Sequence, residues 1–253
     1  VCVCVCVCVA IHVDNSFPAV KTMENLSCKQ QAKFVSSSDF SSFYPSIPLD
    51  KLLDALTWVV RKSFKGTTKN YVTINDRDAF FTAAKSSKLI SVSENDILCW
   101  INFLINNSYF TLGSSIFRQR VGIPMGTDAG LFMANLFLYR YEFEFFEINN
   151  KNPQLCRRLQ HCFRYIDDLL YLGDGDFFAE ITSKMYPPEL NPTRENISST
   201  KTTFLDLDIT VDSKRFSTCI YDKRDNFNFE VVNYCHASSN VPKTYFTERL
   251  PPS

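Results

Sequence analysis

The sequence predicts an α+β fold, because segments with helical periodicity alternate with short strands and hairpins. Apolar residues recur every three or four positions over 49–64, which indicates a helix with one buried face. The run F-R-Y-I-D-D-L-L-Y-L over 163–172 is rich in aromatic and branched residues, which favour strands, and a glycine closes it. With 253 residues, 45% of them hydrophobic, the chain is long enough to bury a sizeable core.

Residues 1–33 are predicted to be a low-complexity and linker segment. The opening V-C-V-C-V-C-V-C-V over 1–9 is what a repeated GTGTGT nucleotide tract encodes, so we interpret it as translated microsatellite outside the fold. No methionine precedes Met23, which indicates a fragment of a longer reading frame. Residues 14–33 are polar and indicate no particular element.

An aspartate follows the first predicted strand. Phe34 and Val35 begin this strand, which leads to Asp39 and then to F-S-S-F-Y-P-S-I-P, where two prolines favour a turn. Tyr44 lies five residues after the aspartate. The carboxylate is either a cation ligand or an ordinary cap or turn residue, and taken alone the second interpretation is favoured.

Two further helices and a hairpin are expected between the first helix and residue 120. Ser93 with Asp96 three residues later has the pattern of a capping box, and an apolar run follows it. The expected elements are a short helix around 78–85, a buried helix over 97–105, and a hairpin with strands at 109–112 and 116–119.

The segment V-G-I-P-M-G-T is predicted to form a loop that leads into a long helix. Gly122, Pro124 and Gly126 predict a loop with exposed backbone, and the helix is expected to run to about residue 147. A glycine loop at a helix start can bind a phosphate. As an isolated signal it is weak, and plain packing is the favoured explanation.

Asp167 and Asp168 interrupt the apolar run over 163–172 and are predicted to lie at the tip of a β-hairpin. Two adjacent like charges raise each other's pKa unless a cation lies between them and a third group, and a divalent metal is the natural partner. Because neighbouring strand residues point to opposite faces, one ion is expected to take only one of the two carboxylates easily. Another acid must then come from elsewhere, and Asp39 is the best candidate.

The last part of the chain is predicted to contain a helix and a strand pair. The helix covers 176–185, and two prolines end it. Alternation over 204–211 predicts one strand, which pairs with a second over 216–221. Asp206 and Asp208 share one face of the first strand, where a solvated edge is a commoner environment for acids than a metal site.

Composition narrows the classes of function. The 27 basic and 27 acidic residues balance, so no overall positive field indicates a nucleic-acid partner, although a balanced total can hide a basic groove. The ten cysteines lack C-x-x-C spacing, which argues against a zinc site or a disulfide frame and fits reduced intracellular thiols. No apolar run is long enough to predict a membrane span.

The motifs, in their order along the chain, resemble those of the palm of reverse transcriptases. D-F-S-S-F-Y-P-S-I at 39–47 is similar to the family's first acidic motif, G-I-P-M-G-T to its nucleotide-side loop, and R-Y-I-D-D to its Tyr-x-Asp-Asp hairpin. The segments T-F-L-D-L-D-I and I-P-L-D-K look most like Penelope-like retroelements, a branch related to telomerase. The resemblance covers about residues 34–249.

This resemblance implies a polymerase palm, which is a ferredoxin-like antiparallel sheet with helices on one face, together with partial fingers and the start of a thumb. The implied domains are the palm over 34–212 with a fingers-like insertion about 65–120, and a primer-grip or thumb-proximal segment over 213–253. The implied activity is RNA-directed DNA polymerisation by two-metal nucleotidyl transfer to a primer 3′-hydroxyl, with Mg²⁺ or Mn²⁺. The implied partners are an RNA template, a DNA primer and deoxynucleoside triphosphates, and the implied location is intracellular, in the nucleus.

The family's functional residues carry over by position. Asp39, Asp167 and Asp168 would be catalytic and would ligate the metal ions. Tyr44 resembles the aromatic gate that crowds a ribose 2′-hydroxyl. The nucleotide-binding side would consist of Phe40, Tyr44, Gln119, Gly122, Pro124 and Gly126, and the primer side of Tyr165, Phe204, Leu205 and Asp206.

Some features depart from the family pattern. Few residues precede Asp39, so the basic fingers are mostly absent, and Asp128 places an additional negative charge near the nucleotide side. One alternative is therefore a catalytically inactive or domesticated remnant that only binds nucleic acid. Another is an unrelated domain whose acids merely occupy turns, which predicts that Asp39 and Asp167 lie far apart.

Overall fold

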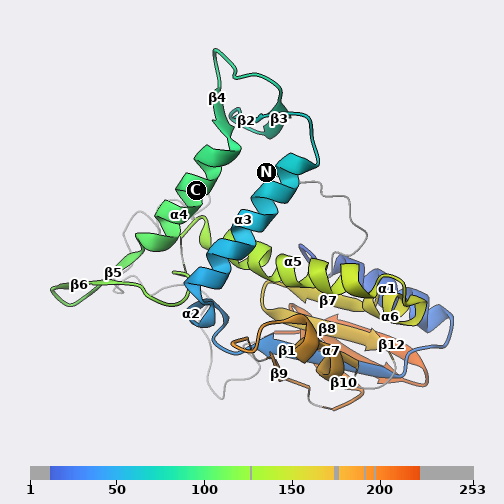
Figure 1. Cartoon of the computed structure of the whole chain (residues 1–253). Coiled ribbons are helices and arrows are strands. Elements are labelled where there is room, and N and C mark those ends of the chain that lie inside the picture. The colour runs from blue at the N-terminus through green and yellow to red at the C-terminus, as the bar shows by residue number, and fades with distance from the viewer. Residues whose placement is uncertain (1–11, 126, 174–176, 191, 197, 223–253) are drawn as a thin grey trace, which may run out of the picture.

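A four-stranded antiparallel sheet forms the centre of the molecule (Figure 1). The computed structural model describes residues 12–125, 127–173, 177–190, 192–196 and 198–222. The strand order is β7-β8-β1-β9. The bounds are β1 Phe34–Phe40, β7 Cys162–Tyr165, β8 Asp168–Gly173 and β9 Pro192–Arg194. Strand β1 pairs with β8 from Phe34 opposite Gly173 to Asp39 opposite Asp168, so the end of β1 lies beside the β7-β8 turn.

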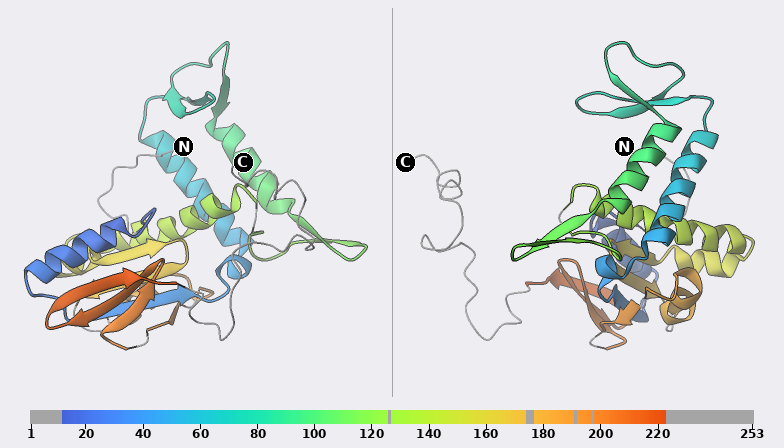
Figure 2. Two further views of the ribbon diagram at one scale, coloured as in Figure 1. Left: turned by 180° about the vertical axis from the view of Figure 1, so that it is seen from behind. Right: turned by 60° about the vertical axis from the view of Figure 1, so that its left-hand side comes forward.

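Both faces of this sheet are buried, which explains the unbroken apolar run of β8. Leu169 and Tyr171 pack into one core with the helices, while Leu170 and Leu172 pack into a second core on the other face. The first core is covered by α2 Phe43–Ser46, α3 Leu49–Lys65, α5 Gly130–Asn149, α6 Pro153–Leu159 and α7 Phe177–Met185. The second is covered by α1 Phe17–Cys28 and by a sheet of β10 Lys201–Phe204, β11 Leu207–Asp212 and β12 Arg215–Ile220, seen from behind in Figure 2.

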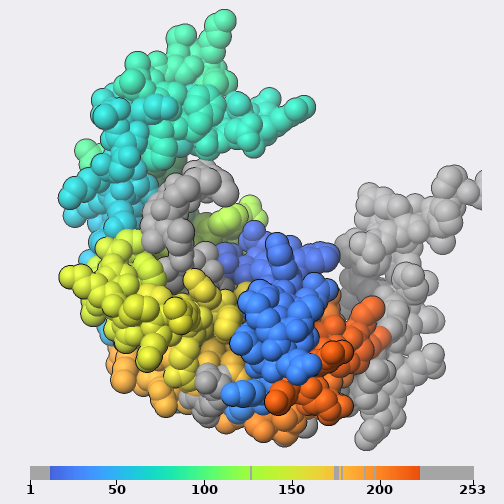
Figure 3. All heavy atoms as spheres, turned by 90° about the vertical axis from the view of Figure 1, so that its right-hand side faces the viewer, coloured from blue at the N-terminus to red at the C-terminus, as the bar shows by residue number. Residues whose placement is uncertain are grey.

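An arm extends from the body on the long helix α3 and its neighbour α4 Glu94–Asn106 (Figure 1). A small sheet joins these helices at one end of the arm, and the space-filling view shows this end standing away from the body (Figure 3). A separate hairpin follows α4. The strands are β2 Tyr71–Ile74, β3 Ala79–Thr82 and β4 Ile90–Ser93 in the small sheet, and β5 Tyr109–Leu112 and β6 Ser115–Arg118 in the hairpin.

The predicted α+β class is confirmed, as are the first amphipathic helix, the capping box and the hairpin tip between β7 and β8. The Ser93 hydroxyl accepts from the Asp96 backbone N–H at 3.3 Å, and the Ser93 backbone N–H donates to the Asp96 carboxylate at 2.8 Å. The low-complexity and linker segment predicted over 1–33 contains α1, whose Ala19, Met23 and Leu26 are buried in the second core.

Three local predictions are wrong. The short helix around 78–85 is replaced by β3, because Phe81 packs edge-on against Phe64 of α3 and the strand completes a sheet. The helix over 97–105 exists but is not buried, since its Trp100, Phe103 and Leu104 are 45 to 63% exposed. The single strand over 204–211 is broken by a two-residue turn at Leu205 and Asp206, which separates β10 from β11.

Among the helices that the structure describes, none combines the length and the apolar character that spanning a bilayer requires.

Candidate active site

Three carboxylates meet where β1 ends beside the β7-β8 turn. Asp39 lies opposite Asp168 in the sheet, and the Phe40 backbone N–H donates to the Asp167 carbonyl at 3.4 Å. One carboxylate oxygen from each of Asp39, Asp167 and Asp168 lies within 4.8 Å of the others, and all three residues are half-buried. Within the described part of the chain this is the one group of acidic, cysteine or histidine side chains close enough to hold a metal ion. The structure therefore brings together side chains more than 120 positions apart in the sequence.

The shape of the turn explains how two adjacent aspartates face the same site. Tyr165 pairs with Asp168, so Ile166 and Asp167 form a two-residue turn and do not follow strand alternation. Ile166 has a φ of 55°, in the left-handed region that costs a branched residue about 1–2 kcal/mol. The assumption that the two side chains point to opposite faces is wrong, because it took regular strand geometry to extend through the tip. How many of the two carboxylates one ion takes stays a prediction.

The site concentrates negative charge. Burial raises the pKa of Asp39 above its ordinary value, and the neighbouring Asp167 and Glu195 raise it further, while the hydrogen bond from the Phe40 backbone partly opposes them. Glu195 follows β9, where its backbone N–H donates to the Ser37 carbonyl at 3.1 Å. Glu195 was not among the residues predicted from the sequence, because nothing in the T-R-E-N segment distinguishes it from a surface acid.

The glycine loop packs directly on the residues that follow Asp39. The Gly122 N–H donates to the Ile47 carbonyl and the Ile123 N–H to the Tyr44 carbonyl, both at 2.8 Å. Gly122 has a φ of +82°, and a Cβ atom there would lie 2.5 Å from the Cα of Pro45. Only glycine fits this close approach. The packing explanation for this glycine therefore holds whatever else the loop does.

Tyr44 lies within electrostatic reach of the acidic group. Burial raises the pKa of the Tyr44 phenol, and the charges of Asp167 and Tyr165 raise it further. Its ring contacts that of Phe43 at a centroid distance of 5.4 Å. The Tyr44 phenol thus interacts electrostatically with Asp167, while the Tyr44 backbone carbonyl accepts from the glycine loop.

The other nucleotide-side candidates differ in their surroundings. Phe40 is a core residue, 1% exposed, that contacts the rings of Phe43 and Tyr186. Gln119 is half-buried and donates to the Val121 carbonyl at 3.1 Å. Pro124 is half-buried, and its carbonyl accepts from the Thr127 hydroxyl at 3.2 Å. Gly126 lies outside the described residues, and Asp128 is exposed.

Two of the primer-side candidates border a pocket beside the acidic group. The pocket has a volume of about 290 Å³. Its lining includes Phe204, Leu205, Asp168, Glu195 and Tyr221. Phe204 is buried, and Leu205 occupies a left-handed turn position with a φ of 55°. The β10-β11 turn therefore approaches the catalytic candidates from the second face of the central sheet.

The other two primer-side candidates do not line this pocket. The exposed Asp206 belongs to the β10-β11 turn, where its backbone carbonyl accepts from the Tyr221 N–H at 2.8 Å. Tyr165 is half-buried against the second core.

Solved structures of telomerase share the fold of this chain. The telomerase of Candida albicans, in complex with the TWJ fragment of telomeric RNA, aligns with a TM-score of 0.56 at 15% identity, over 81% of this chain and 35% of that one. The apo telomerase of Candida tropicalis aligns with a TM-score of 0.56 at 15% identity, over 81% of this chain and 36% of that one. The telomerase of Candida tropicalis in complex with the TWJ fragment of telomeric RNA aligns with a TM-score of 0.54 at 16% identity, over 87% of this chain and 36% of that one.

These likenesses establish a reverse-transcriptase-like fold and no more, because the identities are low. The chain spans about a third of the length of the telomerases that it matches. No protein-family model matches the sequence, and no curated protein matches it.

Proposed function

We propose that this chain is the polymerase part of a retroelement reverse transcriptase, which copies RNA into DNA. The observation that most supports the proposal is the convergence of Asp39, Asp167 and Asp168 within 4.8 Å at the end of the central sheet. Phosphoryl transfer depends mainly on positioning and on neutralising charge, so clustered carboxylates are the expected centre.

The donor set fits magnesium. Mg²⁺ prefers oxygen ligands and is usually held by one or two carboxylates together with substrate phosphates. A site of three half-buried carboxylates, one with a raised pKa, has a charge that a divalent cation would neutralise. When bound, two such ions would activate the primer 3′-hydroxyl and neutralise the charge on the triphosphate.

Each side chain at this site would then have a separate role in nucleotidyl transfer. Asp39 at the end of β1 and Asp167 in the β7-β8 turn would hold the ions, and Asp168 would support them. Tyr44 would exclude ribonucleotides by crowding the 2′-hydroxyl, and the loop that packs on it would form the nucleotide side. The pocket beside the β10-β11 turn would receive the primer end.

The finer assignments follow the sequence motifs. We assign the palm to 34–212, the arm over about 65–120 to the fingers, and 213–253 to the primer-grip or thumb-proximal segment. The Penelope-like motifs favour that branch of retroelements. An RNA template, a DNA primer, deoxynucleoside triphosphates and a nuclear location follow from this proposal.

Primer extension on an RNA template with Mg²⁺ or Mn²⁺ tests the proposal. Wild type should extend a DNA primer, Asp167→Asn should not, and the matched control Asp208→Asn, an acid of β11 outside the group, should behave as wild type. Equal extension by wild type and Asp167→Asn would rule out catalysis at this site. A wild type that binds the primer–template without extending it would be the binding-only remnant.

A further inference from the structure

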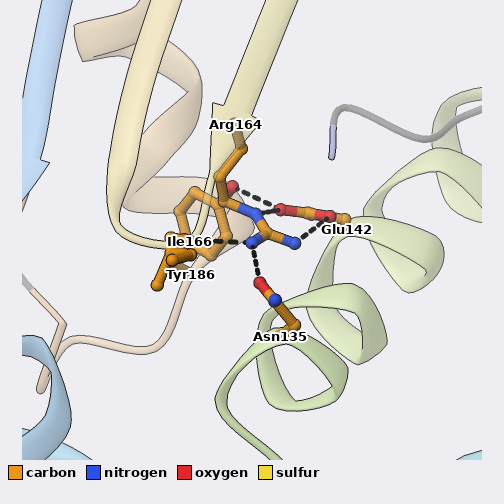
Figure 4. A network of polar contacts seen from close by, with 5 residues as sticks. All are labelled: Asn135, Glu142, Arg164, Ile166 and Tyr186. Atoms are coloured by element: carbon orange, nitrogen blue, oxygen red, sulfur yellow. Dashed lines mark hydrogen bonds and ion pairs between the residues drawn. The ribbon is translucent and has the colours of Figure 1, made fainter. Parts of the chain in front are cut away.

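A fully buried ion pair lies directly behind the acidic turn (Figure 4). The Arg164 guanidinium, on β7, donates through Nε and Nη2 to the two carboxylate oxygens of Glu142 on α5. Its Nη1 donates to the Asn135 side-chain oxygen at 2.8 Å and to the Ile166 backbone carbonyl at 3.0 Å. The Tyr186 hydroxyl donates to Glu142 at 2.9 Å. The Arg164 and Glu142 side chains are 1% and 0% exposed.

Stability alone does not account for such a pair. Removing two charges from water costs about as much as their attraction returns, so buried pairs can often be replaced by apolar residues without loss of stability. Breaking one partner is costly, but replacing the whole set is not. The arrangement therefore calls for a role other than adding stability, and its contacts indicate which.

The contact with the Ile166 carbonyl gives that role. This carbonyl and the Asp167 N–H belong to one planar peptide unit. A hydrogen bond to the carbonyl oxygen therefore restrains the orientation of the backbone that carries the Asp167 side chain. Ile166 is in the unfavourable left-handed conformation, with a φ of 55°, and such turns persist only where their surroundings hold them. Arg164 supplies a rigid planar donor that is always charged and donates to four oxygens of three residues at once.

We propose that Arg164 is a positioning residue, which holds the β7-β8 turn so that Asp167 and Asp168 meet Asp39, and that Glu142, Asn135 and Tyr186 orient Arg164 for this purpose. Two of these partners, Asn135 and Glu142, belong to α5, the helix that follows the glycine loop. The network thereby ties the nucleotide-side helix to the acidic turn. This inference rests on the proposed function, because it assumes that the carboxylates bind metal.

The test replaces the buried ion pair and the Tyr186 hydroxyl together, and it leaves Asp39, Asp167 and Asp168 unchanged. The triple variant Arg164→Met, Glu142→Leu, Tyr186→Phe removes both charges and the hydroxyl together, so no charge is left unpaired. Arg164→Lys keeps the charge but offers a point donor that cannot reproduce the planar fork. The control Thr73→Val removes a buried hydroxyl from the small sheet of the arm, outside this network.

Four quantities are measured for each variant: the thermal unfolding midpoint, the affinity for Mn²⁺ by electron paramagnetic resonance, and kcat and KM in primer extension. Residues that orient metal ligands typically change metal affinity or activity by about 10- to 100-fold when replaced. We expect the folded triple variant to lose about 10-fold or more in Mn²⁺ affinity and in kcat, with KM for the nucleotide little changed. Arg164→Lys should be intermediate, and Thr73→Val should match wild type in metal affinity even if its unfolding midpoint falls.

A folded triple variant with wild-type Mn²⁺ affinity would overturn the positioning role. If the triple variant does not fold, Arg164→Lys decides, and wild-type affinity in that variant would overturn the proposal equally. Measurements on wild type distinguish a failure of the proposed function from a failure of the positioning role. A chain that binds Mn²⁺ with three carboxylates but extends no primer would refute the polymerase, while the metal affinities would still decide the role of Arg164.

Discussion

Replacing Asp39 by asparagine should stabilise the metal-free protein while abolishing its proposed activity. The variant keeps the shape of the side chain and removes one of three negative charges that lie within 4.8 Å of one another. The raised pKa of Asp39 means that the folded state opposes its ionisation. In wild type, the contribution of the Asp39 carboxyl to the free energy of unfolding is therefore fully present below its unfolded pKa of about 3.9. This contribution is lost as the pH rises through the folded pKa.

The magnitude follows from the geometry. Two unit charges 4.8 Å apart repel by about 3 kcal/mol at an effective dielectric constant of about 20. The side chains are only half-buried, and solvent and salt screen them, so we discount the gain to roughly 1 kcal/mol. For a chain of this size that corresponds to an increase of about 2–4 °C in the thermal unfolding midpoint at neutral pH.

Thermal unfolding of wild type, Asp39→Asn and the control Asp208→Asn, with EDTA and then with Mn²⁺, measures this effect. In EDTA at pH 7 the Asp39 variant should unfold above wild type, and the difference should vanish below about pH 3.9, where the carboxyl is protonated in both states. Saturating Mn²⁺ should stabilise wild type and reverse the order. An Asp39 variant that is less stable in EDTA, or that Mn²⁺ stabilises as much as wild type, would refute the reasoning.

Three further predictions concern the surroundings of the site and the arm. Gly122→Ala should lower the free energy of unfolding by about 2 kcal/mol more than Gly113→Ala, measured by denaturant titration, because both glycines have positive φ but only Gly122 would press a Cβ against Pro45. Equal losses would contradict the close approach. Tyr44→Ala should raise the incorporation of ribonucleotides relative to deoxynucleotides in primer extension, and an unchanged ratio would remove its role as a gate. Ser93→Ala should cost about 1 kcal/mol of stability through the lost helix cap, and no loss would contradict that account.

The elements that sequence analysis predicted well are those whose signals are local. The helix over 49–64 follows from its apolar spacing, and the structure extends it by one residue to Lys65. The capping box depends on two residues three apart, and both of its hydrogen bonds form. The hairpin around the acid pair follows from strand preference and the charges at its centre. The position of Asp39 beside this hairpin was predicted from the order of the motifs. The spacing of the residues along the chain does not by itself predict that contact.

Two of the failures result from packing between segments, and the third from a turn without the usual turn residues. Residues 14–33 were interpreted as uninformative because most of them are polar, although Ala19, Met23 and Leu26 recur at helical spacing. These three side chains are buried in the second core, and α1 also lies against β12. The A-F-F-T of β3 becomes a strand because Phe81 finds Phe64 of α3. At Leu205 the chain turns without glycine or asparagine, the residues by which such a turn is normally recognised. For α1 and β3 the deciding contacts come from other elements.

The neighbourhood of the acidic turn combines several features that work against stability. Ile166 adopts a left-handed backbone, Asp39 has a raised pKa beside other acids, and the charge of Arg164 is buried completely. Each has a free-energy cost that ordinary substitutions could relieve: glycine at the turn, asparagine at the acid, or apolar residues in the buried pair. Strain and perturbed pKa values gather at functional sites, because there the geometry is selected for chemistry at the expense of stability. Because these three features occur together at one hairpin, they support the proposed catalytic role of this turn. Acids that merely occupy a turn would not require a buried guanidinium that restrains the turn backbone.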